Sequence, residues 1–440
     1  MKTSITQQAR RDFLKSSAMI AGGSLLASMP LTGAYASGSD TIKIALIGCG
    51  SRGTGAAVQA LSTKENLKLV AMADAFRDRL DGSYKILSEK FKAKVDVPEE
   101  HKFVGFDAYK KAIALADVVL LVTPPGFRPI HFEEAVKQDK HIFMEKPVAV
   151  DSPGIRKVLA TAEEAKRKKL NVLVGLQRRY QDSYVECVKR IEDGALGKIY
   201  AGQVYWNSGG VWVRPRKPGQ TEMEYQMRNW YYFNWLCGDH IVEQHVHNID
   251  VANWLVGSYP ISAQGTGSRA WRTGKDYGEI YDNHAVEFTY ADGSVIYSQC
   301  RHFEGTSNRV NETFQGTKGR IHLDAGKNQG ILWDTNGKEI YNHNTENNRN
   351  PYQTEHDLLF AAIANNRHEF NDAERAAKSV FTAILGRYAT YSGKVLSWDE
   401  ALNADNGLEP DQYAWEALPK VVPGENGLYP YARPGKTKVL

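Results

Sequence analysis

The chain has 440 residues, of which 42% are hydrophobic and 24% charged, so it is long enough for two folded domains and lacks the composition of a disordered or membrane-embedded protein. The formal net charge is +4. Residues 1–36 hold four basic residues and one acid, which leaves only about +1 on the rest and removes the electrostatic argument for a nucleic-acid or anionic-lipid partner.

The N-terminal segment is typical of an export signal. The twin-arginine pattern RRDFLK at residues 10–15 precedes a short apolar run, and the A-x-A pattern at residues 34–36 is typical of a cleavage site. The run is too short and too rich in Gly and Ser to span a bilayer comfortably. We therefore expect a twin-arginine signal peptide at 1–36, a mature protein from about Ser37 without stable membrane insertion, and a periplasmic location. Because this export route carries folded proteins, a tightly held cofactor is also expected.

The region after residue 41 contains the elements of a dinucleotide site in the required order. The β-branched strand TIKIALI leads into the loop GCGSRG, and a helical stretch follows. In this motif Gly48 permits a tight turn, Gly50 lets the backbone approach a pyrophosphate, and Gly53 allows the helix to pack on the strand. The N-terminus of the helix then presents free N–H groups to the phosphates.

The second strand, LKLVAMAD, supports this interpretation. It ends at Asp74, about 20 residues after Gly53, where a carboxylate can bind the ribose hydroxyls. An acid at this position repels a 2′-phosphate and favours NAD. Arg77, three positions on, leaves NADP as an alternative, because its guanidinium could pair with that phosphate.

The rest of the chain divides into two patterns. Strand-like runs DVVLLV, HIFME and NVLVGLQ alternate with helical stretches, which predicts a Rossmann domain with a doubly wound parallel sheet over residues 41–177. From Arg178 onward, strands joined by hairpin turns predominate, as in HAVEFTYADGSVIYSQC. The predicted fold class is therefore α/β, with a C-terminal α+β domain over residues 178–440 that contains a large, mainly antiparallel sheet.

The stretch HIVEQHVHNID, which begins at His240, concentrates histidines and acids. In a single helix over residues 240–255, His245 would fall on the apolar face as a packed core histidine. Three interpretations of the polar face remain open: Glu243 raises the pKa of His247 and orients it for proton transfer, His240 joins these two in a metal site, or the helix is structural. We favour the first interpretation, and no metal is predicted. The polar face would contain His240, Glu243, His247, Asp250 and Trp254.

With these motifs, the chain resembles the Gfo/Idh/MocA oxidoreductases, the family of glucose-fructose oxidoreductase and inositol dehydrogenase. The resemblance runs in the expected order from the first strand to the region near residue 400. It is carried by the glycine loop, Thr123-Pro124 with His131, Glu145-Lys146-Pro147, Glu243-x-x-x-His247-x-x-Asp250, and the segments GALGKI and FQGTKGRI.

The resemblance implies roles for individual residues. Lys146 would lie beside the nicotinamide and stabilise charge on the reacting oxygen, and His247 would be the general acid/base. Glu243 would assist them, although many relatives carry aspartate at its position. The bond between Lys146 and Pro147 is expected to be cis. The implied cofactor-binding residues are Gly48, Gly50, Ser51, Arg52, Gly53, Asp74, Thr123, Pro124, His131, Glu145 and Lys146.

The aromatic stretch NWYYFNW at residues 229–235 suggests a carbohydrate ligand, because C–H faces of sugars stack on aromatic rings. The alternative is that most of these rings fill the core. Gln177, Trp206 and Trp212 are further candidates for the cleft. The predicted substrate-binding residues are Arg178, Tyr180, Trp230 and Asp250.

The leading hypothesis is an exported NAD(P)-dependent oxidoreductase that transfers hydride between a tightly bound nicotinamide cofactor and a secondary hydroxyl or ketone of a sugar or glycoside, with C3 as one candidate carbon. The alternative is an NAD-dependent glycosidase that works by oxidation, elimination, hydration and reduction, with Glu243 and either Tyr180 or His240 as the extra acid/base pair. A binding protein without activity would not need both Lys146 and His247. The resemblance also implies a homo-oligomer, a dimer or tetramer, associated through the open face of the second sheet.

Overall fold

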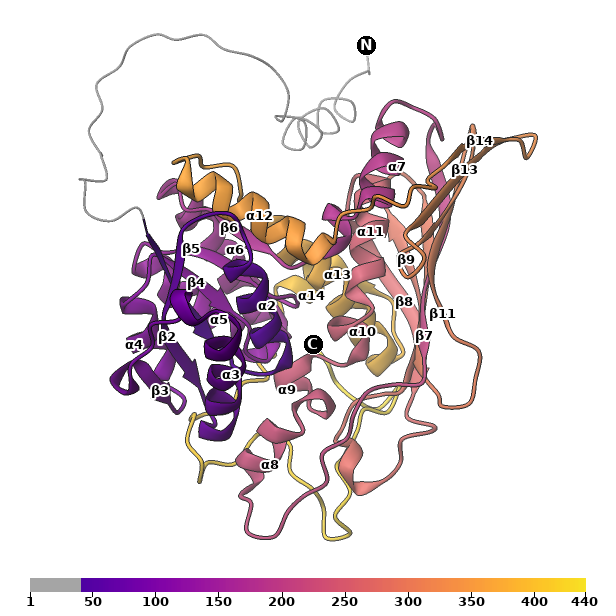
Figure 1. Cartoon of the computed structure of the whole chain (residues 1–440). Coiled ribbons are helices and arrows are strands. Elements are labelled where there is room, and N and C mark those ends of the chain that lie inside the picture. The colour runs from indigo at the N-terminus through magenta and orange to yellow at the C-terminus, as the bar shows by residue number, and fades with distance from the viewer. Residues whose placement is uncertain (1–40) are drawn as a thin grey trace.

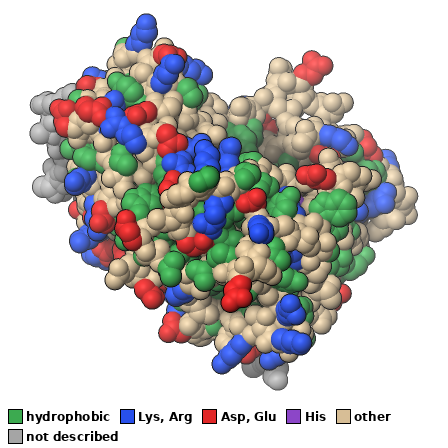
Figure 2. Space-filling model, turned by 90° about the horizontal axis from the view of Figure 1, so that it is seen from below, with side chains coloured by type: hydrophobic (Ala, Val, Ile, Leu, Met, Phe, Trp, Pro, Cys, Tyr) green, Lys and Arg blue, Asp and Glu red, His purple; other side chains and the backbone are tan. Residues whose placement is uncertain are grey.

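The computed structural model describes residues 41–440, so the predicted signal peptide and the start near Ser37 lie outside the described residues. Two halves of the chain lie side by side in Figure 1, each built around its own sheet. In the face seen in Figure 2, acidic and basic side chains are interspersed, as the small net charge predicts. Among residues 41–440, no helix combines the length and apolar character needed to cross a membrane.

The N-terminal half contains a six-stranded parallel sheet in the order β3-β2-β1-β4-β5-β6. This order reverses beside β1 and β4, which places a ligand crevice at the carboxyl ends of these strands. The predicted doubly wound Rossmann fold is confirmed. The strands are β1 (Ile42–Ile47), β2 (Leu67–Asp74), β3 (Lys102–Val104), β4 (Val118–Leu121), β5 (His141–Met144) and β6 (Val172–Val174), and the helices are α2 (Ser51–Leu61), α3 (Arg77–Lys90), α4 (Ala108–Ala114), α5 (Arg128–Lys137) and α6 (Ser152–Arg167).

The C-terminal half contains a nine-stranded sheet in the order β14-β13-β12-β11-β7-β10-β9-β8-β15. All neighbouring strands in it are antiparallel except β7 and β10, so the prediction of a mainly antiparallel sheet is confirmed. The strands are β7 (Ile199–Ser208), β8 (Pro260–Ser268), β9 (Asn283–Tyr290), β10 (Val295–His302), β11 (Arg309–Gly316), β12 (Gly319–Asp324), β13 (Gln329–Asp334), β14 (Glu339–Asn342) and β15 (Leu396–Ser397).

Helices fill the space between the two sheets. Helix α13 (Ala373–Ser392) packs on β8 and β9 on one side and on α6 on the other, and α11 (Val246–Val256) packs on β7 (Figure 1). Alternate residues of β9 and β10 are buried, as expected for strands with one face against helices. The remaining helices are α7 (Asp182–Glu192), α8 (Glu222–Arg228), α9 (Asn234–Cys237), α10 (His240–Glu243), α12 (Pro351–Ala364) and α14 (Trp398–Leu402).

Helix α12 does not follow the domain boundary predicted at residue 178. It packs on α2 of the Rossmann half, where Leu359 and Phe360 join the hydrophobic core beneath that helix. Gln353 Nε2 also donates to the carbonyl of Gln59 at 3.0 Å. The boundary at residue 178 therefore separates the strands of the two sheets along the chain. The N-terminal half, however, also needs α12 to bury its apolar surface.

Two segments bridge the halves beside α3. Arg228 at the end of α8 pairs with Asp78 of α3 at 3.1 Å. In the C-terminal segment that follows α14, drawn in yellow in Figure 1, the Trp415 ring lies 4.7 Å from Phe106 and 5.1 Å from Phe76 between ring centroids. Both segments therefore reach the β2–α3 side of the Rossmann sheet.

The single helix predicted over residues 240–255 is wrong. Helix α10 ends at Glu243 and α11 begins at Val246. At the break, the N–H of His245 donates to His240 O and that of His247 donates to Gln244 O, instead of to carbonyls four residues earlier. The broken helix turns His240 and His247 in different directions, which a continuous helical wheel cannot represent.

Candidate active site

The glycine loop has the geometry that its sequence predicts. Gly48 has φ +97°, and a Cβ there would lie 2.5 Å from Thr123 N; a Cβ on Gly53 would lie 1.9 Å from Gly48 O. Gly50 has no neighbour within 4 Å of a built Cβ, so its open side can receive a ligand. No side chain caps the N-terminus of α2, and its first N–H groups remain available to phosphates. These features fit a dinucleotide pyrophosphate.

Asp74, at the end of β2, lies in the same pocket as Gly50. Its carboxylate accepts hydrogen bonds from Cys49 N at 2.6 Å and from Phe76 N at 2.9 Å. Burial raises the pKa of Asp74, and these two backbone hydrogen bonds oppose the rise. The position fits recognition of ribose hydroxyls.

Arg77, proposed from the sequence as a partner for a 2′-phosphate, does not line this pocket. Its guanidinium pairs with Asp81 at 2.8 Å and with Glu99 at 2.5 Å, both at the surface. Arg79 lines the pocket instead. Helical geometry decides between them, because residues two positions apart on α3 point in different directions.

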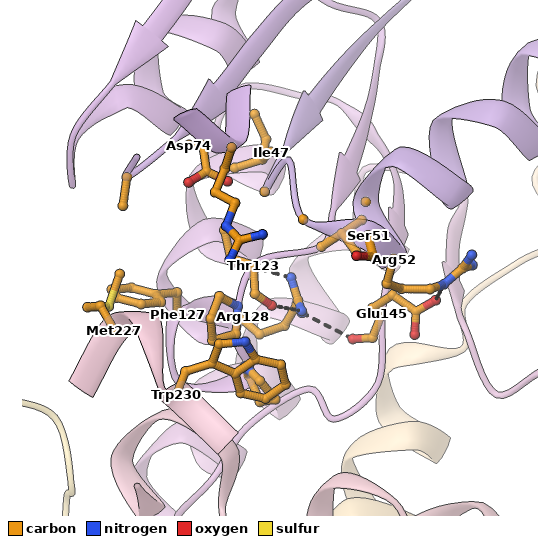
Figure 3. A pocket seen from close by; sticks show the side chains of 18 of the residues that line it. Ile47, Ser51, Arg52, Asp74, Thr123, Phe127, Arg128, Glu145, Met227 and Trp230 are labelled. Carbon is orange, nitrogen blue, oxygen red and sulfur yellow. Dashed lines mark hydrogen bonds and ion pairs between the residues drawn. The ribbon is translucent and has the colours of Figure 1, made fainter. Parts of the chain in front are cut away.

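A buried arginine that the sequence did not single out organises the pocket floor. Arg128 donates from Nε to Glu145 O at 3.1 Å and from Nη2 to Thr123 O at 2.5 Å, so it links the ends of β4 and β5 (Figure 3). Burial lowers the pKa of Arg128 to about 10. His131 Nδ1 lies 3.1 Å from Thr123 Oγ1, and burial holds the pKa of His131 well below its ordinary value. Nothing in the local sequence around Arg128 distinguishes it from a surface residue.

Glu145 faces the glycine loop from the other side of this floor. Its carboxylate pairs with Arg52 Nε at 2.5 Å (Figure 3). Arg52 Nη2 also lies 3.7 Å from Glu355 of α12, a carboxyl that is fully buried. Burial, with a contribution from Glu145, raises the pKa of Glu355 well above its ordinary value. The ion pair of the predicted cofactor residues Arg52 and Glu145 therefore lies against α12, which comes from a distant part of the sequence.

Lys146 and Glu243 meet across the two halves of the chain. Lys146 Nζ donates to Glu243 Oε1 at 2.9 Å and to the Glu243 carbonyl at 2.5 Å. The Lys146-Pro147 bond is cis, as expected. This pair brings the end of β5 against the end of α10, which fixes the ammonium at the junction between the halves.

His247 lies in the first turn of α11 and lines the same pocket as Lys146. Burial, and then the charges of Lys146 and Arg178, hold its pKa well below the ordinary value. The expectation that Glu243 raises the pKa of His247 is therefore wrong, because the Glu243 carboxylate binds Lys146 instead. The ring is neutral near pH 7 and can accept a proton.

The other two histidines of the opening stretch lie in the core. His245 is fully buried with Nε2 2.8 Å from Ser298 Oγ, which confirms it as a packed core histidine. His240 is also fully buried and does not line the pocket, so the metal set of His240, Glu243 and His247 is not brought together.

His240 belongs to a buried cluster around Asp239 and His284, whose nitrogen and oxygen atoms lie within 4.8 Å of one another. The Asp239 carboxylate accepts from the backbone and ring of His240, from Tyr281 N at 2.9 Å and from Tyr391 Oη at 2.5 Å, with His284 Nε2 3.3 Å away. These donors occupy the lone pairs of Asp239. Hydrogen bonding accounts for the cluster, which anchors the start of α10.

Three of the four predicted substrate residues lie outside the pocket. Each has a polar partner elsewhere, and this pairing explains their positions. Arg178 pairs with Glu312, Tyr180 Oη donates to Asp372 at 3.0 Å, and Asp250 pairs with Arg179 at 2.7 Å. Trp230, in contrast, lines the pocket, as do Gln177, Trp206 and Trp212.

The aromatic stretch 229–235 divides between pocket and core. Trp230 is at the pocket, where its ring lies 5.8 Å from Trp212, whereas most of the other rings are buried in a separate core cluster. Trp206 stacks near His247 with centroids 6.0 Å apart. Figure 3 shows Trp230 opposite Asp74 and the glycine loop. The core interpretation therefore holds for most of the stretch, and Trp230 is the exception.

The pocket is a continuous cavity of about 540 Å³. Asp74, the glycine loop and the strand-end residues line it on the Rossmann side. Lys146, Glu243, Gln244 and His247 meet at the junction of the halves, and aromatic rings line the opposite wall. A neutral imidazole beside a positively charged side chain can take a hydroxyl proton while the resulting negative charge on oxygen is stabilised.

Comparisons with known proteins agree with the fold. Residues 42–174 match the family model described as "Oxidoreductase family, NAD-binding Rossmann fold", and residues 188–392 match "Oxidoreductase family, C-terminal alpha/beta domain". The inositol 2-dehydrogenase of Rhizobium meliloti (strain 1021) is 26% identical over 296 residues, which are 66% of this chain and 76% of that protein.

Solved structures share the fold. The aldose-aldose oxidoreductase of Caulobacter crescentus, complexed with glycerol, is 19% identical with a TM-score of 0.61, over 81% of this chain and 99% of that chain. The scyllo-inositol dehydrogenase of Lactobacillus casei, with bound NAD(H) and scyllo-inositol, is 20% identical with a TM-score of 0.60, over 82% and 99%. Because the two family models together match well over half of the chain in the expected order, this protein belongs to the Gfo/Idh/MocA family of NAD-binding oxidoreductases.

Proposed function

We propose that this protein is an exported dehydrogenase that oxidises a secondary hydroxyl of a polyol, sugar or glycoside, or reduces the corresponding ketone, with NAD held tightly between reactions. One observation carries the proposal: Lys146 and a neutral His247 share a cavity with the glycine loop and Asp74. Relatives named as inositol 2-dehydrogenases support the polyol class.

The proposed chemistry needs two groups from the chain. NAD, when bound, supplies the carbon that accepts or returns hydride. His247 takes the hydroxyl proton through its neutral ring during oxidation and returns a proton during reduction. Lys146 stabilises the negative charge that develops on the same oxygen, and Glu243 holds the ammonium in place through two contacts. The proton therefore stays on the protein until solvent exchanges it.

Recognition of a ring-shaped substrate is assigned to the aromatic wall. Trp206, Trp212 and Trp230 can stack on the C–H faces of a pyranose or cyclitol, while hydroxyl groups reach the polar junction. Arg178, Tyr180 and Asp250 are not part of this proposal, because their side chains pair with Glu312, Asp372 and Arg179 and do not line the cavity.

The bridging segments at the β2–α3 side support the proposed tight retention of NAD. Met227 and Arg228 of α8 line the cavity, and Arg228 pairs with Asp78 of α3 at 3.1 Å. Trp415 supports Phe76 and Phe106, which line the same end. A cofactor enclosed in this way would dissociate only after these contacts open, which suits a periplasmic enzyme with no supply of free NAD. Homo-oligomer formation through the open face of the nine-stranded sheet remains a further expectation.

The glycosidase alternative has less support. Its extra acid/base pair was Glu243 with Tyr180 or His240, and neither Tyr180 nor His240 lines the cavity. Glu243 is engaged by Lys146. Simple oxidation needs only the groups that the cavity brings together.

The experiment uses protein that begins at Ser37, purified without added NAD. The absorbance band of reduced nicotinamide is followed with myo-inositol, and nitrophenol release is followed in parallel with p-nitrophenyl α- and β-glycosides. Reduced cofactor that accumulates to one equivalent, without nitrophenol, supports a dehydrogenase with retained NAD. Nitrophenol released without net reduction supports the glycosidase. Activity that requires added NAD contradicts tight retention, and equal activity in Lys146→Ala or His247→Ala contradicts the assigned chemistry.

A further inference from the structure

Gln244 occupies the break between α10 and α11 and lines the cavity beside Lys146, Glu243 and His247. The Lys146 ammonium contacts the carbonyl of Glu243, so the backbone of Gln244 begins one peptide bond from the ammonium site. Its side-chain amide has an oxygen that accepts hydrogen bonds and an NH2 group that donates them. The group that faces the cavity determines whether the substrate must supply a donor or an acceptor.

A buried histidine fixes the oxygen end. Gln244 Oε1 lies 2.7 Å from His302 Nε2, and His302 Nδ1 lies 3.0 Å from Arg272 Nη1. A guanidinium can only donate, so Nδ1 must be the unprotonated nitrogen that accepts. In a neutral ring, the proton then sits on Nε2, and burial followed by the charges of His240 and Arg272 keeps the pKa of His302 well below its ordinary value. His302 Nε2–H therefore donates to Gln244.

The opposite orientation of the amide is excluded by the same chain. With the amide turned over, its NH2 group would face Nε2–H of His302, and two donors would meet in a buried site. The orientation thus follows from Arg272 and does not depend on which amide atom is assigned as oxygen. Within residues 41–440, no protein group accepts a hydrogen bond from Gln244 Nε2. The atom is also not buried without a partner, so it remains accessible to a ligand.

Arg272 is held firmly enough to act as the origin of this chain. It is 5% exposed, its guanidinium lies over the rings of Tyr232 and Tyr277 at 5.3 and 5.8 Å, and its backbone N–H donates to Asp282 at 2.8 Å. Gly210 leaves the necessary space, because a Cβ there would lie 1.7 Å from Arg272 Nη2. The chain Arg272–His302–Gln244 therefore connects a packed core to the cavity wall.

We infer that Gln244 is a substrate-specificity residue whose NH2 group donates to an oxygen next to the carbon being oxidised, with His302 and Arg272 as its positioning residues. The inference rests on the proposed function and deepens it. Lys146 and His247 act on the reacting oxygen, and Gln244 adds a donor for a neighbouring oxygen. The substrate class it selects is a vicinal diol of a cyclitol or sugar, since a compound that lacks the neighbouring hydroxyl leaves this donor unpaired.

The test compares myo-inositol with its monodeoxy analogues as substrates of the NAD-loaded enzyme. Gln244→Met keeps the size of the side chain and removes the donor, so kcat/KM for myo-inositol should fall roughly 10- to 100-fold. For the analogue without the contacted hydroxyl, the wild type should already be slow and the substitution should change little. Gln264→Met makes the same chemical change at an exposed position of β8 and serves as control. An equal loss with every analogue, or no loss with myo-inositol, would overturn the inference.

Substitutions of Arg272 test the positioning chain. Arg272→Met should reproduce the altered discrimination of Gln244→Met, and Arg272→Lys, which still donates, should restore part of it. NAD binding and thermal stability identify a misfolded variant, and in that case the Gln244→Met result alone decides. Discrimination that is unchanged in a folded Arg272→Met variant overturns the positioning role.

Binding measurements separate the inference from the proposed function. Calorimetric titration of myo-inositol into the NAD-loaded enzyme should show binding that Gln244→Met weakens by a similar factor. Gln244-dependent binding without oxidation would refute the dehydrogenase and leave the inference standing. Oxidation with binding and discrimination independent of Gln244 would refute the inference alone, and a wild type that neither binds nor oxidises myo-inositol would refute a cyclitol substrate in both.

Discussion

The two walls of the cavity are built in different ways. On the Rossmann wall, the cavity is lined by short motifs at the ends of parallel strands. Each motif is contiguous in sequence: the glycine loop, Thr123-Pro124 and Glu145-Lys146-Pro147. The opposite wall is made from the break between α10 and α11 and from aromatic side chains on β7 and on the segment between β7 and α9. Backbone geometry dominates the first wall, and side-chain packing dominates the second.

The difference determines how each wall should respond to substitution. A wall made of backbone loses stability when a Cβ is added at a crowded glycine, whereas a wall made of side chains loses specificity or rate while the fold remains intact. Lys146 is the point where the two walls touch, through its pair with Glu243. The largest effect is therefore expected there.

Lys146→Met should lower kcat by about 10³-fold, because it removes the charge that stabilises the reacting oxygen. NAD binding should persist, since the glycine loop and Asp74 are untouched. Single-turnover measurement of reduced nicotinamide with myo-inositol checks the rate, and fluorescence of bound reduced cofactor checks binding. A variant that loses binding and rate together would mean that Lys146 belongs to the cofactor wall alone.

Gly53→Ala and Gly50→Ala form a matched pair on the Rossmann wall. The new Cβ at Gly53 meets Gly48 O at 1.9 Å, so the free energy of unfolding should fall by about 3 kcal/mol even without NAD. The Cβ at Gly50 meets nothing in the protein, so stability should be nearly unchanged while NAD affinity falls. Urea unfolding and NAD titration separate the two outcomes, and equal destabilisation by both substitutions would contradict the loop geometry.

The pH dependence of oxidation should report the neutral ring of His247. The pKa of His247 lies well below 6.5 in the folded protein, so kcat/KM should stay level as pH falls from 8 to about 6.5. Once the pH falls below the pKa of His247, kcat/KM should drop by up to tenfold per pH unit. The same shift lowers stability as pH falls through about 6.5, because the unfolded chain binds a proton there that the folded ring does not.

Glu243→Gln distinguishes the structural account of this profile from the hypothesis that Glu243 raises the pKa of His247. If the carboxylate raised that pKa, its removal would move the acidic limb to lower pH. The structure places the carboxylate on Lys146, so we expect a lower rate and no movement of the limb to lower pH.

Glu355→Gln should give the smallest effect and tests whether the Rossmann wall depends on α12. The pKa of Glu355 is raised in the folded state, so its contribution to stability is full below about pH 4.5 and is lost as pH rises. The neutral amide avoids this loss, and stability should rise by about 1–2 kcal/mol at pH 8. Thermal unfolding at pH 8 and pH 4.5 is the measurement. A gain of the same size at both pH values would exclude a buried carboxyl as its source.

Much of the Rossmann wall could be predicted from sequence because its chemistry depends on local spacing. Gly48, Gly53 and Asp74 follow from a strand, a turn and a helix in order, and the structure places them as expected. The face of α11 could not be predicted, because the break at Gln244 and His245 depends on hydrogen bonds that a helical wheel ignores. Arg178, Tyr180 and Asp250 looked like cleft residues, yet their polar atoms pair with Glu312, Asp372 and Arg179 from distant parts of the chain.

The sequence by itself determined the Rossmann fold and the glycine loop, and it singled out Lys146 and His247 as candidate site residues. These features depend on patterns within a few tens of residues. Only the tertiary structure decided that Glu243 binds Lys146, that the pKa of His247 is lowered and that the amide of Gln244 is oriented from Arg272. The physical reason is that a pKa or an amide orientation depends on which charges and donors lie within a few ångströms, and in this protein those partners come from distant segments.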